Sequence, residues 1–342
     1  MRALYFDQHG GIEVLNLGER PLPDPGPGEV RVGVRCAALN HLDLFVVHGM
    51  PGVPIPLPHV PGADGAGVVE ALGPGVDTVA VGDEVVFDPG ISCGTCELCH
   101  RGEQSLCVQF GVLGEHRNGT FAEAVVVQAA SLAPRPPHLT WEEAAALPLA
   151  HLTAWRMLFT RGRLRAGECV LIHGVGGGVA LACLQLAHLA GARVLVTSRS
   201  PEKLRRAAEL GADETIPAGD DVAREVRRLT GKRGVDVVVD SVGAATWAQS
   251  LKAAAKGGRI VTCGATTGPN PAEEIRLIFW NHLSILGSTM GSREDFRSLM
   301  AAVGQHRLRP VMDSVMPLAD GREALARMER GEQFGKIVLA VR

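Results

Sequence analysis

Four cysteines share one short segment of the chain: Cys93, Cys96, Cys99 and Cys107. Thiolates at this spacing can surround one soft divalent metal ion tetrahedrally. Two residues separate each of the first three cysteines from the next, so tight turns can bring their sulfurs together, and the longer gap lets Cys107 return as the fourth ligand. The segment therefore predicts a zinc lobe over residues 90–108, with one structural zinc ion.

Disulfide bonds, an iron–sulfur cluster and coincidence are the alternatives to zinc. A ferredoxin-type cluster also begins with cysteines two residues apart, but its fourth cysteine usually follows after about three residues and precedes proline. Here the gap is longer and Val108 follows Cys107. The remaining cysteines stand singly in apolar surroundings, as reduced core cysteines do; they are Cys36, Cys169, Cys183 and Cys263. Zinc fits the spacing better than these alternatives.

The length and charge of the chain limit its class. At 342 residues the chain is long enough for two domains, because single cores usually stop growing near about 250–300 residues. A net charge of -3 offers no basic surface for nucleic acid. Residues 1–7 lack a secretory apolar stretch, and polar residues, glycine or proline interrupt every long apolar run. We therefore expect a cytoplasmic protein that binds neither nucleic acid nor membranes.

The first third of the chain is rich in glycine, proline and β-branched residues. Residues 30–34, 65–70 and 82–87 have the composition of short strands between turns. This pattern predicts a β-rich domain with the cysteine lobe as an excursion. Further on, Thr140 and Glu143 form a capping box that predicts the start of a helix.

From residue 170 onwards, apolar strands alternate with helices. The order strand, glycine turn, helix, strand implies a right-handed parallel unit; these segments are expected at 170–173, 174–180, 181–189 and 193–197. Ser200 then caps a further helix with Pro201 in its first turn. Three more buried strands are expected at 235–240, 259–263 and 283–287. The middle of the chain therefore predicts a doubly wound parallel sheet, and the fold class is α/β.

The C-terminal segment lies outside this alternation. A helix around 296–303 and a closing strand at 336–341 are expected to return to the first domain, which makes that domain discontinuous. The predicted domains are 1–149 with 291–342, and 150–290.

The glycine turn before the first helix of this sheet predicts a dinucleotide site. Gly176, Gly177, Gly178 and Val179 would let a pyrophosphate approach the backbone amides at the positive end of the helix. The usual glycine spacing is imperfect, since Ala180 takes the last position, and a tight structural turn is the alternative. The turn's place between a strand and a helix favours dinucleotide binding.

The end of the second strand bears on the choice of coenzyme. NAD-binding chains typically have an acidic residue there, which holds the ribose hydroxyls. This chain has Ser198 and Arg199, with Lys203 one turn further on. A hydroxyl and one or two cations could bind a 2′-phosphate, so we expect NADP(H) rather than NAD(H). The alternative is that Arg199 and Lys203 are solvated surface charges.

Together with residues 240–243 and the ending 334–339, these features resemble the medium-chain dehydrogenase/reductases, the superfamily of zinc-containing alcohol dehydrogenases and quinone reductases. The resemblance spans essentially the whole chain, and the cysteine lobe is its most specific part. It implies a GroES-like β-rich catalytic domain, a Rossmann domain, a homodimer or homotetramer, and NAD(P)-dependent oxidation or reduction of a small-molecule substrate.

The chain departs from that family at the catalytic zinc. By resemblance, Asn40 replaces the first zinc cysteine, Ala63 the histidine ligand and Leu149 the second cysteine, while Leu42 replaces the hydroxyl that relays the alcohol proton. Zinc would normally polarise the substrate oxygen as a Lewis acid. We therefore expect hydride transfer to or from a carbonyl, enone or quinone without catalytic zinc.

Two other hypotheses stay open. The first is a zinc-dependent alcohol dehydrogenase with a substitute metal site built from Asn40, Asp64 and His151. The second is a dinucleotide-binding protein without enzymatic activity, whose thiolate lobe senses oxidants.

The resemblance also assigns individual roles. The expected catalytic residues are Asn40 and His151, as hydrogen-bond donors to the substrate oxygen, and His41, beside the coenzyme pyrophosphate. A neutral packing role is the alternative for His151. Asp43 and Asp64 are expected to hold hydrogen bonds within their domain. We expect His59 on a surface loop. Further coenzyme contacts are expected from Thr153, Val242, Gly243, Gly264 and Thr266.

Overall fold

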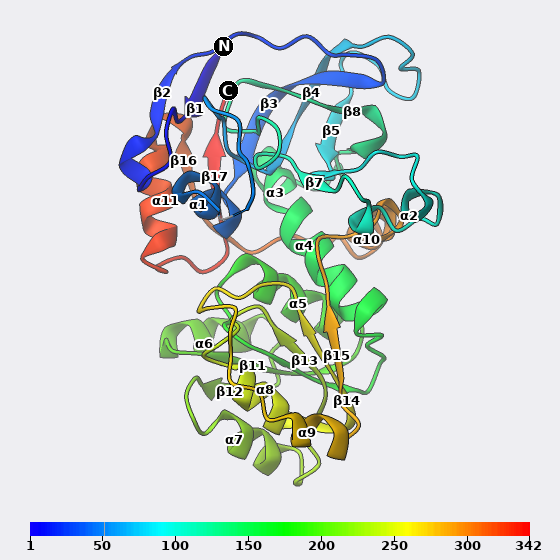
Figure 1. The fold of residues 1–342 in the computed structure, drawn as a ribbon, viewed down its shortest axis with the longest axis vertical. Helices are drawn as coiled ribbons and strands as arrows, with labels where there is room; N and C mark the ends of the chain where they lie inside the picture. The colour runs from blue at the N-terminus through cyan, green and yellow to red at the C-terminus, as the bar shows by residue number, and fades with distance from the viewer. Residues whose placement is uncertain (51) are drawn as a thin grey trace. The chain divides into compact units, whose positions relative to one another are not determined.

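The computed structural model describes residues 1–50 and 52–342 (Figure 1). Contacts between residues divide the chain into two compact units. Unit 1 comprises Met1–Ala150 and Ser292–Arg342, and unit 2 comprises His151–Gly291. Among the described residues, none of the helices combines the length and hydrophobicity needed to cross a lipid bilayer.

Unit 1 is built on a seven-stranded sheet in the order β16-β17-β3-β4-β5-β9, with β8 pairing to β3. Strands β16 and β17 are parallel, and the other pairs are antiparallel. Its strands are β3 (Glu29–Ala38), β4 (Asp64–Leu72), β5 (Glu84–Phe87), β8 (Ala124–Gln128), β9 (Leu132–Pro134), β16 (Met312–Pro317) and β17 (Lys336–Ala340). Two small antiparallel pairs join β1 (Arg2–Tyr5) to β2 (Asn16–Glu19) and β6 (Gly90–Ile91) to β7 (Gly111–Val112).

Unit 1 also contains several helices. They are α1 (His41–His48), α2 (Glu97–His100), α3 (Trp141–Ala146), α10 (Arg293–His306) and α11 (Gly321–Glu329), with α4 (Pro148–Trp155) running across the boundary between the units. The predicted capping box is confirmed, because Glu143 N donates to Thr140 Oγ1 and Thr140 N donates to the Glu143 carboxylate. Single 3₁₀ turns lie at Ile12–Val14, Gln104–Leu106, Ala129–Ser131 and Leu318–Asp320.

Unit 2 is a six-stranded parallel sheet in the order β12-β11-β10-β13-β14-β15. The chain order reverses between β10 and β13, where doubly wound sheets bind their ligands. The strands are β10 (Cys169–Ile172), β11 (Arg193–Ser198), β12 (Glu214–Pro217), β13 (Val235–Asp240), β14 (Ala254–Thr262) and β15 (Ser284–Gly287). The helices are α5 (Gly178–Leu189), α6 (Pro201–Glu209), α7 (Val222–Leu229), α8 (Trp247–Ala253) and α9 (Ile275–Trp280), preceded by a π-helical segment at Arg156–Arg161.

The predicted α/β fold class is confirmed, with differences at element boundaries. The helix after the glycine turn begins at Gly178, three residues before the expected start, because only Gly177 remains extended as its N-cap. Strand β14 begins at Ala254 and ends before Cys263. The predicted strand at 235–240 has the observed bounds.

Candidate functional site

The four cysteines of the lobe meet in unit 1. Their Sγ atoms all lie within 4.8 Å of one another. The recorded separations are 3.5 Å between Cys93 and Cys107, 3.9 Å between Cys93 and Cys99, and 3.9 Å between Cys96 and Cys107. A tetrahedral zinc ion with Zn–S bonds of about 2.3 Å requires sulfurs about 3.8 Å apart. The four thiolates therefore fit one zinc ion.

Backbone amides support negative charge on these sulfurs. Cys96 N donates to Cys93 Sγ, and the amides of Cys93 and Gln109 donate to Cys107 Sγ, each at 3.3 Å. Hydrogen bonds from the Thr95 and Cys96 backbone lower the pKa of the Cys93 thiol to about 6. Burial, by contrast, raises the pKa of the Cys99 thiol to about 11. The backbone amides therefore favour the thiolate form at Cys93, and thiolate is the form of cysteine that binds zinc. All eight cysteines are free thiols in the described structure, so the disulfide alternative has no support there.

A second polar cluster includes Asn40, one of the three positions where the resemblance places a catalytic zinc ligand. Lys336 Nζ donates to Asn40 Oδ1 at 2.6 Å and to Asp64 Oδ2 at 2.9 Å. Asn40 Nδ2 donates to Asp64 Oδ2, also at 2.9 Å, and closes a triangle of three side chains. The side chains of Lys336 and Asp64 are 4% and 0% exposed. We call these three residues the lysine cluster.

Backbone amides donate to the carboxylates of Asp64 and its neighbour Asp43. Leu149 N donates to Asp64 Oδ1 at 2.7 Å, so both carboxylate oxygens of Asp64 are occupied. Asp43 accepts from Asn40 N at 2.7 Å and from Gly62 N at 3.1 Å. Burial raises the pKa of Asp43 to about 7, while these amides and the Lys336 ammonium act in the opposite direction. These contacts agree with the expected hydrogen-bonding role of both aspartates.

The local backbone structure explains how the side chains of Asn40 and Lys336 reach the lysine cluster. Asn40 is the extended N-cap of α1, with Asp43 as the capping-box partner. Lys336 begins β17 directly after Gly335, which has φ +111° and would bring a Cβ against the Val311 carbonyl. Lys336 N donates to that carbonyl at 2.9 Å. A glycine is therefore required for the approach that directs Lys336 into the core.

The glycine turn in unit 2 keeps an open helix N-terminus. A Cβ on Gly177, the N-cap of α5, would meet nothing within 4 Å. Gly176 has φ +128°, and a Cβ there would lie 2.7 Å from Lys203 Cδ and 3.4 Å from its Nζ. The Lys203 side chain therefore lies against the glycine turn.

The remaining predicted coenzyme residues lie at strand ends of unit 2. Ser198 ends β11 and is buried, with its Oγ accepting from Ser200 N at 3.2 Å. Arg199 is exposed. Gly243 N and Val242 N donate to Asp240 Oδ1 at 3.0 and 2.9 Å. Gly264 and Thr266 are exposed and lie just beyond the end of β14.

The expected catalytic residues fall in different units. Asn40 and His41 belong to unit 1, where His41 is the exposed first residue of α1. His151 belongs to unit 2 and is buried, with Nε2 3.4 Å from Gln185 Oε1. Thr153 is also buried and donates to Met290 Sδ at 3.8 Å.

Two features of unit 1 differ from the sequence analysis. His59 was expected on a surface loop, but it is 1% exposed and its Nε2 lies 3.0 Å from the Gly114 carbonyl oxygen. The backbone of His59 forms an antiparallel bridge with that of Phe6, and this pairing holds the His59 segment against the core of unit 1. Lys336, which lies at the centre of the lysine cluster, had no predicted site role. The available signal was a lysine at the start of an otherwise apolar strand.

Comparison with known proteins agrees with this architecture. Residues 26–137 match the alcohol dehydrogenase GroES-like domain family, and residues 178–305 match the zinc-binding dehydrogenase family. A zinc-type alcohol dehydrogenase-like protein of Schizosaccharomyces pombe is 34% identical over 100% of this chain and 99% of its own. A quinone oxidoreductase of Pseudomonas aeruginosa is 34% identical over 86% of this chain and 83% of its own. A crystal structure of an NAD-dependent alcohol dehydrogenase has 49% identity and a TM-score of 0.96, with both chains covered in full.

Proposed function

Because the chain belongs to the zinc-containing alcohol dehydrogenase superfamily, the medium-chain dehydrogenase/reductases, we propose that it is an NAD(P)-dependent oxidoreductase that works without catalytic zinc. Its substrate would be a carbonyl, enone or quinone. The structural zinc ion would be held by the four cysteines of the lobe. Membership of this enzyme family leaves no support for the hypothesis of a sensor without activity.

The lysine cluster carries this proposal. An ammonium already donates to Asn40 and Asp64, two of the three side chains from which a substitute metal site could be built. Zinc binding there would place a second cation beside Lys336 and would compete for the occupied oxygens of Asp64. Asparagine is also a poor zinc ligand.

The chain's own residues would stabilise charge on the substrate. The bound nicotinamide coenzyme supplies or accepts the hydride. When a carbonyl is reduced, the electron pair of its double bond moves onto oxygen, and hydrogen-bond donors stabilise the resulting negative charge. Asn40 and His151 are the proposed donors, while His41 and Lys203 would lie near the coenzyme phosphates.

Removal of a donor tests these roles. We expect Asn40→Ala and His151→Ala each to lower kcat by about a hundredfold, as loss of one oxyanion donor does. His188→Ala is the matched control, because His188 is exposed at the end of α5. The substrate panel would contain aldehydes, enones, quinones and alcohols. Full rates in both variants would contradict the assignment of donors.

A zinc-dependent alcohol dehydrogenase with an atypical site is the second candidate. The zinc-type relative named above favours it. It predicts alcohol oxidation that strong chelators abolish, and two tightly held zinc ions per chain. Our proposal predicts one zinc ion and activity that does not depend on a second.

For the coenzyme we propose NADP(H), supported by the absence of an acidic residue after β11 and by the exposed Arg199. The position of Lys203 over the glycine turn, and the NAD-dependent relative, favour NAD(H) instead. The test is kcat/KM with each coenzyme, in wild type and in Arg199→Ala. A specific fall with NADPH supports a 2′-phosphate site, and unchanged kcat/KM with NADPH excludes Arg199 from that role.

We also propose a cytoplasmic homodimer or homotetramer. Ile275, Phe279 and Trp280 are exposed apolar residues on the short helix α9, and such clusters often mark association surfaces. Sedimentation equilibrium would give the mass in solution, and a mass of one chain would contradict this proposal.

A further inference from the structure

Lys336 places a positive charge almost wholly inside unit 1. Its side chain is 4% exposed, and the partner carboxylate of Asp64 is fully buried. Removing an ammonium from water is strongly unfavourable unless an anion and other acceptors compensate. Strand packing alone does not require such a charge, because apolar side chains of similar volume often replace buried ion pairs without loss of stability.

We propose that Lys336 is a positioning residue whose ammonium group acts on the reaction site through Asn40. Its ammonium polarises the Asn40 amide, and the remaining N–H of that amide stabilises the charge that develops on the substrate oxygen. This inference rests on the proposed function, and specifically on a reaction without catalytic zinc. Lys336 thereby performs, through Asn40, the electrostatic task that a metal ion has in other hydride-transfer enzymes.

The hydrogen bonds of Asn40 have the required direction. Its Oδ1 accepts from the ammonium at 2.6 Å, which draws electron density away from the amide nitrogen. Chains of hydrogen bonds strengthen one another in a low-dielectric interior, by about 10–30% per bond. Asn40 Nδ2 donates to Asp64 Oδ2 at 2.9 Å, and its other recorded acceptor among the described residues is the Ala38 carbonyl at 3.5 Å. That weakly held N–H is the donor available to a substrate oxygen.

The charges of the cluster are nearly balanced without a metal ion. Lys336 carries one positive charge and Asp64 one negative charge. The neighbouring Asp43 has a pKa raised to about 7 by burial, so it is partly protonated near neutral pH. An added zinc ion would find the ammonium already in contact with Asp64 and Asn40.

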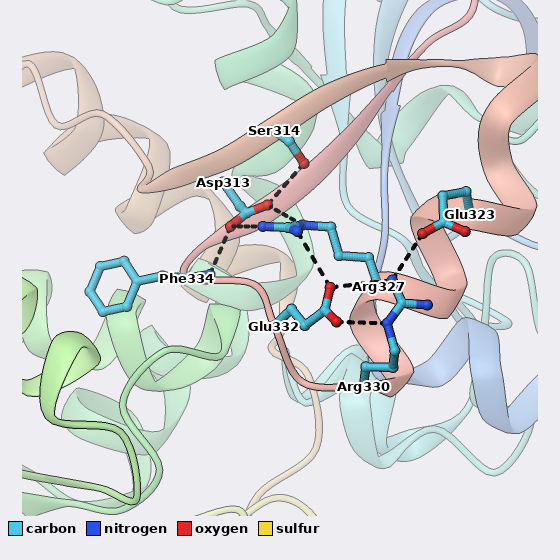
Figure 2. Close-up of polar contacts among 7 residues, drawn as sticks. All are labelled: Asp313, Ser314, Glu323, Arg327, Arg330, Glu332 and Phe334. Carbon is cyan, nitrogen blue, oxygen red and sulfur yellow. Dashed lines mark hydrogen bonds and ion pairs between the residues drawn. The ribbon is translucent and has the colours of Figure 1, made fainter.

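A separate network fixes the turn that leads into Lys336. Figure 2 shows Asp313 of β16 accepting from Phe334 N at 2.9 Å and from Arg327 Nε at 2.9 Å. Arg327 also pairs with Glu332 at 3.5 Å, within the same turn. The turn is thus anchored two residues before Lys336, and the Lys336 backbone is anchored to Val311. The network therefore restricts where the ammonium can lie.

The first test compares a variant that lacks the Lys336 ammonium with a variant that keeps a positive charge at this position. Lys336→Met removes the ammonium while keeping the length of the side chain, and Lys336→Arg keeps a cation. We expect Lys336→Met to lower kcat by at least about tenfold with an unchanged dissociation constant for the coenzyme, because charge stabilisation is needed mainly in the transition state. Lys336→Arg should recover part of the loss. Lys256→Met, at an exposed position of β14, is the matched control and should keep the wild-type kcat.

A second variant covers the case in which Lys336→Met does not fold. The double variant Lys336→Met/Asp64→Asn removes cation and anion together, so no unpaired charge stays buried. It should fold and still show the low kcat. A folded double variant with wild-type kcat would overturn the inference, even if the chain binds one zinc ion as proposed.

A spectroscopic readout is independent of substrate. The side-chain amide protons of Asn40, assigned in nitrogen-15 spectra by their loss in Asn40→Gln, should shift upfield in Lys336→Met and in the double variant. Lys336→Arg should retain most of the wild-type shift. Unchanged amide shifts in a folded variant without the ammonium would contradict polarisation of Asn40. A requirement for a second zinc ion would instead contradict the proposed function.

Discussion

The cysteine lobe and the lysine cluster both lie in unit 1, and they balance negative charge in opposite ways. The lobe brings four thiol groups together and provides no cation of its own among its recorded contacts. The lysine cluster holds a buried carboxylate against an ammonium from the same chain. Under the proposed function, the lobe would need a zinc ion to balance its thiolates, whereas the lysine cluster would balance its carboxylate with an ammonium of the chain itself.

The greatest loss of stability is expected when one of the four cysteines of the lobe is replaced. Replacement of one ligand, in Cys96→Ser or Cys99→Ser, should unfold or aggregate the protein, since structural zinc contributes roughly 10 kcal/mol or more to folding in small zinc peptides. Cys263→Ser, outside the lobe, is the matched control. Thermal unfolding and light scattering would measure both. Either ligand variant with retained stability and activity would refute a structural role for the lobe.

A smaller loss is expected from breaking the lysine cluster. Lys336→Met leaves Asp64 buried without its cation, and loss of one partner of a buried pair typically costs about 3–5 kcal/mol. The double variant with Asp64→Asn should regain much of this stability, because both charges are then absent. Urea unfolding of the three proteins would measure the difference. Equal stability of the single and double variants would show that the two charges are not coupled.

The smallest change in stability is expected at Asp88, a buried carboxyl group that, unlike Asp64, has no recorded ion pair with a lysine among the described residues. The pKa of Asp88 is raised to about 7, mainly by burial and to a smaller extent by the nearby Asp295, while Gly90 N and Arg293 act in the opposite direction. Between pH 4 and 7 the folded protein therefore binds a proton at Asp88 that the unfolded chain has released. This contribution to stability is lost as the pH rises, by at most about 1.4 kcal/mol per pH unit.

Asp88→Asn should remove that pH dependence. We expect the variant to gain stability relative to wild type between pH 5 and pH 8, in urea unfolding at fixed ionic strength. A constant difference across this range would contradict the raised pKa.

Local patterns in the sequence predicted most of the fold. Alternating apolar segments predicted the parallel sheet of unit 2, and the spacing of Cys93 to Cys107 predicted a cluster that the structure brings together. Strand β16 and helix α11 were not predicted, although they build one edge of the unit 1 sheet and its cover.

Local sequence patterns could not predict the lysine cluster. Lys336 and Asp64 are 272 positions apart in the chain, so only the folded sheet brings them together. The sequence identified Asn40, Ala63 and Leu149 as substitutions at the expected metal site, but it could not show what fills their surroundings. Lys336 is one of only five lysines in the chain, and its place at the start of a buried strand was the one local hint.

We propose that the chain binds one zinc ion, in the cysteine lobe, and supplies its own cation at the second position. The decisive measurement is the zinc content per folded chain, determined by elemental analysis after exhaustive dialysis against a mild chelator. We predict one zinc ion per chain, with activity retained. Two tightly held ions, with activity that disappears when the second is removed, would contradict the claim.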